Sequence, residues 1–163
     1  MPSHPLADAY CAYRRKLPHW RLEGGVYFLT WRLREQQAEL NPSERELIVS
    51  ILLHFHGTRY RLHGYVVMND HVHVIVEPIA GFELKTITHS WKSFTANQLQ
   101  RRFARKGSIW QEECFDRIVR DEVEYLEKAQ YIHDNPFNRW PEIADYPWLG
   151  FPQWQAGAEA NKR

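Results

Sequence analysis

The fold is decided by residues 61–76, which read RLHGYVVMNDHVHVIV. Two runs rich in valine and other strand-forming residues flank Asn69-Asp70, a pair that is common in turns. We therefore expect two antiparallel strands, residues 61–68 and 71–76, joined as a hairpin. The second strand is apolar at every position except His71 and His73.

The two histidines of this strand share a face, because successive strand side chains alternate and residues two apart lie about 7 Å from each other. Val72, Val74 and Val76 then point the other way, into a core. Two imidazoles on one face form half of a divalent-metal site. The alternative is a pair of polar residues on an exposed sheet face. The surrounding valines favour the metal site, because a central strand seldom carries two histidines that have no functional role.

Other segments have equally clear patterns. A strand is expected over 26–33, after Gly24-Gly25, and Ser43 and Glu46 have the spacing of a capping box that starts a helix. Pro136 should end the last helix at Asn135. The remaining expected elements are helices over 43–56, 83–103 and 121–135 and an extended stretch over 114–119. This order predicts an α+β, ferredoxin-like sandwich: a single domain whose antiparallel sheet has helices packed on one face.

Length and composition agree with one globular domain. The chain has 163 residues, of which 44% are hydrophobic and 25% charged, so a disordered protein is excluded. We expect a basic arm over 1–22, the main domain over 23–139 and a Trp/Pro-rich tail over 140–163. No apolar stretch is long enough to cross a membrane and the first residues lack an apolar leader, which predicts a cytoplasmic protein. Cys11 and Cys114 are far apart, which excludes a zinc site of the usual spacing.

Charge is unevenly distributed although the net charge is only +1. Residues 83–106 contain six basic residues and one acid, whereas residues 112–145 contain ten acids and four bases. A basic segment fits contacts with a nucleic-acid backbone, and a solvated helix face is the alternative. Aromatic residues make up 14% of the chain; they can build a core or stack on unpaired bases.

The last expected helix brings further reactive groups together. Tyr131 and Asn135 are four residues apart and so share a helix face. The amide oxygen of Asn135 suits magnesium or manganese, and the phenol of Tyr131 is a possible nucleophile. Lys128, one turn earlier, could favour the phenolate or hold a phosphate. The alternatives are an ordinary core or surface aromatic at Tyr131 and a helix C-cap at Asn135.

These motifs together resemble a known family. His71-Val72-His73 resembles the HUH motif, in which U is a hydrophobic residue, and residues 131–136, YIHDNP, resemble the signature of the single-tyrosine transposases. Residues 14–20 with 26–30, and Ile109-Trp110-Gln111 with Phe115-Asp116-Arg117, are similar to segments of the REP-associated tyrosine transposases. The resemblance covers residues 13–150.

The resemblance implies a mechanism on single-stranded DNA. His71, His73 and Asn135 would hold Mg²⁺ or Mn²⁺, although related transposases often have a glutamine in place of this asparagine. Tyr131 would attack the scissile phosphate, giving a 5′-phosphotyrosine and a free 3′-hydroxyl that can later rejoin strands. A phenol with a pKa of about 10 needs help to react at neutral pH. In this family the substrate is a short palindromic hairpin with a flanking tetranucleotide. Expected DNA contacts are Arg14, Arg15, Lys16, Lys85, Lys92, Arg101, Arg102, Arg105 and Lys106, with Trp110 either stacking on a base or buried in the core.

Other functions remain possible from the sequence. One is a catalytically inactive regulator that binds hairpin DNA, and another is a mobile-element transposase of the same superfamily, which usually works as a dimer. The REP-associated kind could be a monomer, so both a monomer and a homodimer stay open. A metal phosphoesterase would need a second histidine motif. His54 and His56 do not supply one, because residues two apart in the expected helix do not share a face.

Overall fold

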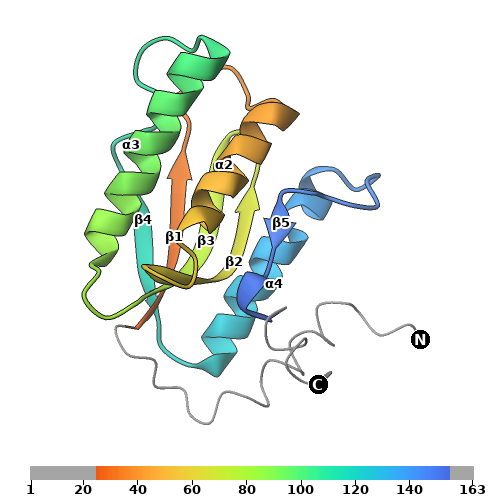
Figure 1. Ribbon diagram of the computed structural model, residues 1–163. Helices are drawn as coiled ribbons and strands as arrows, with labels where there is room; N and C mark the ends of the chain where they lie inside the picture. Colours follow the sequence, from red (N-terminus) through yellow and green to blue (C-terminus); the bar gives the residue numbers. More distant parts are fainter. Residues whose placement is uncertain (1–24, 155–163) are drawn as a thin grey trace, which may run out of the picture.

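The computed structural model describes residues 25–154, which form one sheet with helices on both sides (Figure 1). The five strands are antiparallel to their neighbours and lie in the order β4-β1-β3-β2-β5. Because β3 lies between β1 and β2, the chain forms the split β-α-β arrangement of ferredoxin-like folds, as predicted. The elements are β1 (Val26–Arg32), α2 (Pro42–His54), β2 (Tyr60–Val67), β3 (His71–Pro78), α3 (Leu84–Phe103), β4 (Phe115–Val119), α4 (Glu122–Arg139) and β5 (Leu149–Gly150).

The helices cover both faces of the sheet, so the expectation that all of them pack on one face is wrong. α2 and α3 cover one face together, and α4 crosses the other (Figure 1). The reason is that the second face is also apolar: Phe28, Val66 and Ile75 are almost completely buried against Ile132 of α4. An apolar sheet face left in water would be costly, so a second helical layer is needed.

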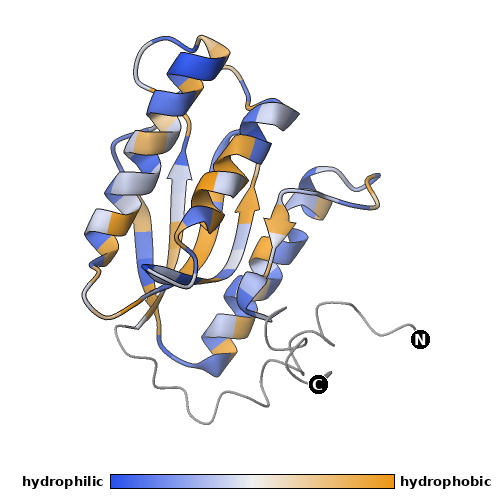
Figure 2. Ribbon diagram, viewed as in Figure 1, coloured by the Kyte–Doolittle hydropathy of each residue, from blue (hydrophilic) through white to orange (hydrophobic). Residues whose placement is uncertain are grey.

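β3 divides its side chains between these two layers as the sequence predicted. Val72, Val74 and Val76 lie in the core under α2 and α3. Ile75 lies in the core under α4, and because alternate residues share a face, His71 and His73 point to the same side. Figure 2 shows the hydrophobic residues that fill much of β2 and β3. The two histidines are therefore polar groups beside the apolar residues Phe28, Val66 and Ile75 of this layer.

Two helix ends differ from the expectation. α2 is capped by Asn41, whose side chain accepts from the Glu44 backbone N–H, while the Glu44 carboxylate accepts from the Asn41 N–H. The capping box is thus shifted two residues from Ser43. α4 does not stop at Asn135 but continues through Pro136 to Arg139. Pro136 is buried and lies one turn from the helix end, so only one backbone hydrogen bond is lost.

The described part of the Trp/Pro-rich tail contains a short strand. β5 pairs with β2 through Leu149 and Gly150. Beyond it, Phe151 and Trp154 are buried in the α4-side core. The expected arm over 1–22, with Arg14, Arg15, Lys16 and also Cys11, lies outside the described residues. Within residues 25–154, no helix is long and apolar enough to cross a membrane.

Candidate active site

The tyrosine and the two histidines predicted to act together are neighbours in the structure. α4 crosses the sheet so that the Tyr131 ring lies 5.1 Å from the His73 ring, measured between centroids. The His71 and His73 rings are 4.6 Å apart. The Asn135 amide nitrogen lies 3.5 Å from His73 Nε2. The helix spacing and the strand spacing therefore converge on one place.

Each histidine is held by a second polar group. Asp70 Oδ1 lies 2.6 Å from His71 Nδ1, and the Thr30 hydroxyl oxygen lies 2.6 Å from His73 Nδ1. Where the oxygen accepts a proton from Nδ1, the lone pair on the opposite ring nitrogen, Nε2, is left for another ligand. Metal-binding histidines are commonly oriented by contacts of this kind.

The electrostatics of the site favour neutral imidazoles. His73 is 2% exposed, and burial, together with the positive charge that His71 and Arg32 can carry, lowers its pKa to about 3. Burial also lowers the pKa of His71, although Asp70 opposes this effect. Both rings are therefore unprotonated at neutral pH. A neutral imidazole is the form that binds a metal ion.

The three predicted ligands fit a divalent cation by their chemistry. Within residues 25–154, no group of three or more His, Cys, Asp or Glu side chains is arranged to hold a metal ion. A site here therefore depends on the Asn135 amide, which hydrogen-bonds toward both imidazoles. Turning this amide about its last bond would aim its oxygen, a hard ligand, at the same point.

The nucleophile candidate opens onto a pocket of about 310 Å³. Tyr131 is 50% exposed, so its hydroxyl can reach a bound molecule. The Lys128 ammonium lies in the same pocket, 4.9 Å from the centre of the Phe28 ring. A phosphate entering this pocket would meet a cation and a phenol at once. The lining residues are Phe28, Thr30, Arg32, His73, Phe115, Lys128 and Tyr131.

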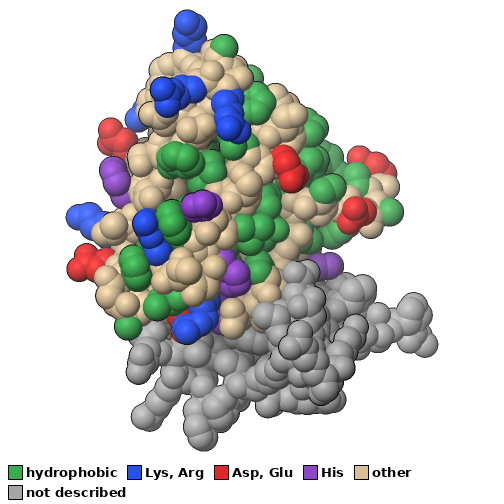
Figure 3. All heavy atoms as spheres, in the orientation of Figure 1, with side chains coloured by type: hydrophobic (Ala, Val, Ile, Leu, Met, Phe, Trp, Pro, Cys, Tyr) green, Lys and Arg blue, Asp and Glu red, His purple; other side chains and the backbone are tan. Residues whose placement is uncertain are grey.

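The predicted DNA contacts on α3 and its following loop lie on another part of the molecule. α3 has no acidic residue, and its basic side chains are visible over the side of the molecule that it forms with α2 (Figure 3). Four of the expected contacts are exposed: Lys85, Arg101, Arg102 and Lys106. The Lys92 ammonium, by contrast, donates to the backbone oxygens of Gln111 and Glu112. α3 covers the sheet face opposite to His73 and Tyr131.

Arg105 and Trp110 are occupied inside the protein. The Arg105 side chain is 8% exposed and forms an ion pair with Glu44. Trp110 is 5% exposed, and its indole N–H donates to the Thr95 hydroxyl. The structure therefore agrees with the interpretation of Trp110 as a buried core residue.

Sequence reasoning missed Thr30 and Arg32, which join the site from β1. Thr30 pairs with His73 and Arg32 with His71 in the register between β1 and β3. The available signal was the alternation Phe28, Thr30, Arg32, which places two polar side chains on one face of a strand. Nothing in the sequence gave the register that sets them beside the histidines.

Comparison with known proteins identifies the family to which the chain belongs. The model of a family described as "Transposase IS200 like" matches residues 27–135, which includes every part of the candidate site. The chain belongs to this family of transposases, enzymes that nick and rejoin DNA.

Two curated relatives are similar in sequence. A REP-associated tyrosine transposase of Escherichia coli K12 is 22% identical over 145 residues, covering 85% of this chain and 81% of the relative. An uncharacterized protein of Haemophilus influenzae is 31% identical over 97 residues, covering 47% of this chain and 54% of the relative.

Two solved structures share the fold. One is a REP-associated tyrosine transposase bound to a REP hairpin, with a TM-score of 0.62 and 20% identity, covering 83% of this chain and 81% of that one. The other is a putative transposase from Deinococcus radiodurans, with a TM-score of 0.54 and 17% identity, covering 73% of this chain and 96% of that one. At these identities the likeness establishes the fold.

Proposed function

We propose that this transposase is a metal-dependent endonuclease and strand transferase that acts on single-stranded DNA beside a palindromic hairpin. The observation that carries the proposal is the meeting of Tyr131 with the His73–Asn135 pair: ring centroids 5.1 Å apart, and an amide 3.5 Å from the imidazole. The hairpin substrate is supported by the solved relative that is bound to a REP hairpin.

In the proposed reaction, Tyr131 is the nucleophile. Its phenol oxygen forms a bond to phosphorus, the bond from phosphorus to the 3′-oxygen breaks, and the phenol proton is released as the departing oxygen gains one. The product is a 5′-phosphotyrosine and a free 3′-hydroxyl. Attack by a 3′-hydroxyl on the phosphotyrosine reverses these changes and joins strands without an external energy source.

The other residues of the site position and stabilise the phosphate. A Mg²⁺ or Mn²⁺ ion held by His71, His73 and Asn135 would polarise the phosphate oxygens when bound. Lys128 lies in the same pocket and would neutralise charge on the phosphate or the phenolate. Lys85, Arg101, Arg102 and Lys106 are exposed and remain proposed backbone contacts for the rest of the DNA.

The proposed site is complete within one chain. Tyr131 lies over the histidines of its own sheet, and all three proposed ligands come from β3 and α4. This arrangement supports cleavage by a monomer, in which the tyrosine acts beside its own histidines. It favours the REP-associated kind over a transposase whose tyrosine helix is exchanged between subunits.

The test is formation of a covalent adduct. We would incubate the protein with labelled single-stranded oligonucleotides containing repeat hairpins of its own genome, in Mg²⁺ or Mn²⁺, and separate the products on a denaturing gel. An adduct is expected for the wild type and for Tyr27→Phe, a matched control on the opposite sheet face. It should be absent for Tyr131→Phe and in the presence of EDTA.

The same experiment separates the alternatives. Tight hairpin binding with no adduct in either metal would contradict the enzyme and favour the inactive regulator. An adduct that persists in Tyr131→Phe would show that the nucleophile is wrong. Mixing Tyr131→Phe with His71→Ala protein restores cleavage only if the tyrosine acts in trans, so restored activity would contradict the monomer.

A further inference from the structure

A second pocket lies directly beside the catalytic pocket. It has a volume of about 320 Å³, the size of small-ligand sites. Arg32 lines both pockets, and Asp70, which lines the second one, hydrogen-bonds to His71. A chain threaded through the catalytic pocket could therefore continue into this one. The remaining lining residues are Leu33, Arg34, Glu35, Gln37, Glu39 and Gln111.

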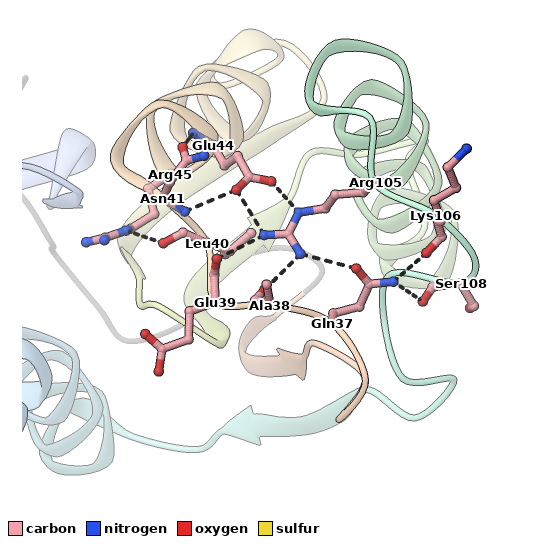
Figure 4. A network of polar contacts seen from close by, with 10 residues as sticks. All are labelled: Gln37, Ala38, Glu39, Leu40, Asn41, Glu44, Arg45, Arg105, Lys106 and Ser108. Atoms are coloured by element: carbon pink, nitrogen blue, oxygen red, sulfur yellow. Dashed lines mark hydrogen bonds and ion pairs between the residues drawn. The ribbon is translucent and has the colours of Figure 1, made fainter.

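The walls of this second pocket are fixed by internal hydrogen bonds. Arg105 reaches across from the loop after α3 to Glu44 and to the backbone oxygens of Ala38 and Glu39 (Figure 4). Gln37 bonds the backbone oxygens of Lys106 and Ser108. The two loops that flank the pocket are thus tied together before any ligand arrives, which is typical of a preformed binding site.

Two more side chains that line the pocket, Arg34 and Gln111, also form hydrogen bonds within the protein. Arg34 donates to the Ser108 hydroxyl and to the backbone oxygen of Trp110. Gln111 donates from its side chain to the backbone oxygen of Leu33. The Nε group of Arg34 and the side-chain amide of Gln111 are therefore already bonded within the wall.

Three charged groups of the pocket remain available. Within residues 25–154, the guanidinium of Arg32 and the carboxylates of Glu35 and Glu39 have no hydrogen bond or ion pair, and all three residues are exposed. Carboxylates repel a phosphate but accept hydrogen bonds from the amino groups of bases. Arg32, at the boundary with the catalytic pocket, is placed to bind the phosphate that links two nucleotides.

We infer that this second pocket binds the base of a nucleotide adjoining the scissile phosphate and selects a base that carries an amino group. The inference rests on the proposed DNA-cleaving function and extends it to sequence choice at the cut. Glu35 and Glu39 accept from adenine, cytosine or guanine. Thymine has no exocyclic amino group, and its one donor, N3–H, lies between two carbonyl oxygens that repel a carboxylate, so thymine is disfavoured.

The test is a binding selection that does not depend on cleavage. Tyr131→Phe protein is mixed in Mg²⁺ with a pool of hairpin oligonucleotides whose flanking single strands are randomised, and the retained DNA is sequenced. We expect one flank position at which thymine is depleted about fivefold or more. The depletion should disappear in Glu35→Ala/Glu39→Ala, made in the same background, and persist in the matched control Glu142→Ala, which removes an exposed carboxylate after α4.

Each outcome decides between the two ideas. Thymine depletion that depends on Glu35 and Glu39 supports the pocket, even if the wild type forms no adduct and the nuclease is contradicted. Adduct formation without such depletion, or depletion that survives in the double variant, overturns the pocket and leaves the nuclease standing. Retention of no DNA would overturn both. Thermal melting of the variants verifies that the changes leave the fold intact.

Discussion

Replacement of Arg105 by methionine should destabilise the protein while leaving the number of its phosphate contacts with DNA unchanged. The Arg105 and Glu44 side chains are 8% and 4% exposed, so the ion pair between them is shielded from water. Removing the guanidinium leaves the Glu44 carboxylate buried and, within residues 25–154, with one remaining hydrogen bond, from the Asn41 backbone N–H. Breaking a buried pair in this way costs about 3–5 kcal/mol.

A second substitution, at Glu44, should reduce this loss of stability. Glu44→Gln removes the buried negative charge but keeps an acceptor for the Asn41 N–H, because glutamine also suits the third position of a capping box. The double variant Arg105→Met/Glu44→Gln should therefore be less destabilised than the sum of the two single variants. This non-additivity is expected for residues that contact each other directly.

The assays are thermal melting and DNA binding as a function of salt. For a chain of this length Arg105→Met should lower Tm by about 6–20 °C, whereas the exposed Arg101→Met should change stability by no more than about 0.5 kcal/mol. At a temperature where both are folded, the salt dependence of hairpin binding should fall by about one phosphate contact for Arg101→Met and stay unchanged for Arg105→Met. A reduced salt slope at wild-type stability for Arg105→Met would refute the reasoning and restore Arg105 as a DNA contact.

Three further changes test other parts of the structure. Thr30→Val removes the oxygen beside His73 Nδ1 and should weaken metal affinity about 10–100-fold in a calorimetric titration; unchanged affinity would contradict a positioning role for Thr30. Gly64→Ala places a Cβ 2.9 Å from the Phe151 ring and should cost about 1–3 kcal/mol in urea unfolding, partly recovered by Phe151→Leu; a neutral result would mean that the tail moves freely. Burial lowers the pKa of His56 in the folded protein. As pH drops below about 6.5, His56 therefore becomes protonated in the unfolded chain before it does in the folded one, and the stability of the fold decreases. His56→Asn should reduce that fall between pH 7.5 and 5.5, and an identical pH profile would exclude this contribution.

The strands and the helix faces could be predicted because they depend on local patterns. The alternation in β3 placed His71 and His73 together, and the spacing in α4 placed Tyr131 and Asn135 together. What brings the two pairs to one point is the side of the sheet on which α4 packs. That choice depends on the apolar residues of three strands at once, so the sequence led to the wrong face for α4 although it placed the members of each pair together.

The predicted DNA contacts show the same limit of prediction from sequence. A run of basic side chains predicts a solvated or DNA-binding surface equally well at Arg101 and at Arg105, because charge patterning carries no information about burial. Arg105 is turned inward since Ala104, just before it, adopts the left-handed conformation that ends α3. Only the tertiary structure shows that Arg105 contacts the Glu44 carboxylate, 61 residues earlier in the chain.

The position of Tyr131 is finally a consequence of how α4 is anchored. Two turns before it, the Tyr125 hydroxyl lies 2.8 Å from His63 Nδ1 and accepts a hydrogen bond from the Trp154 indole at 2.7 Å. His63 Nε2 lies 3.0 Å from a Glu77 carboxylate oxygen on the neighbouring strand. These groups are buried, so leaving any of them without its partners would be costly, and the network favours a single placement of the helix. The same core that closes the α4 side of the sheet therefore holds the tyrosine over the histidines of its own chain.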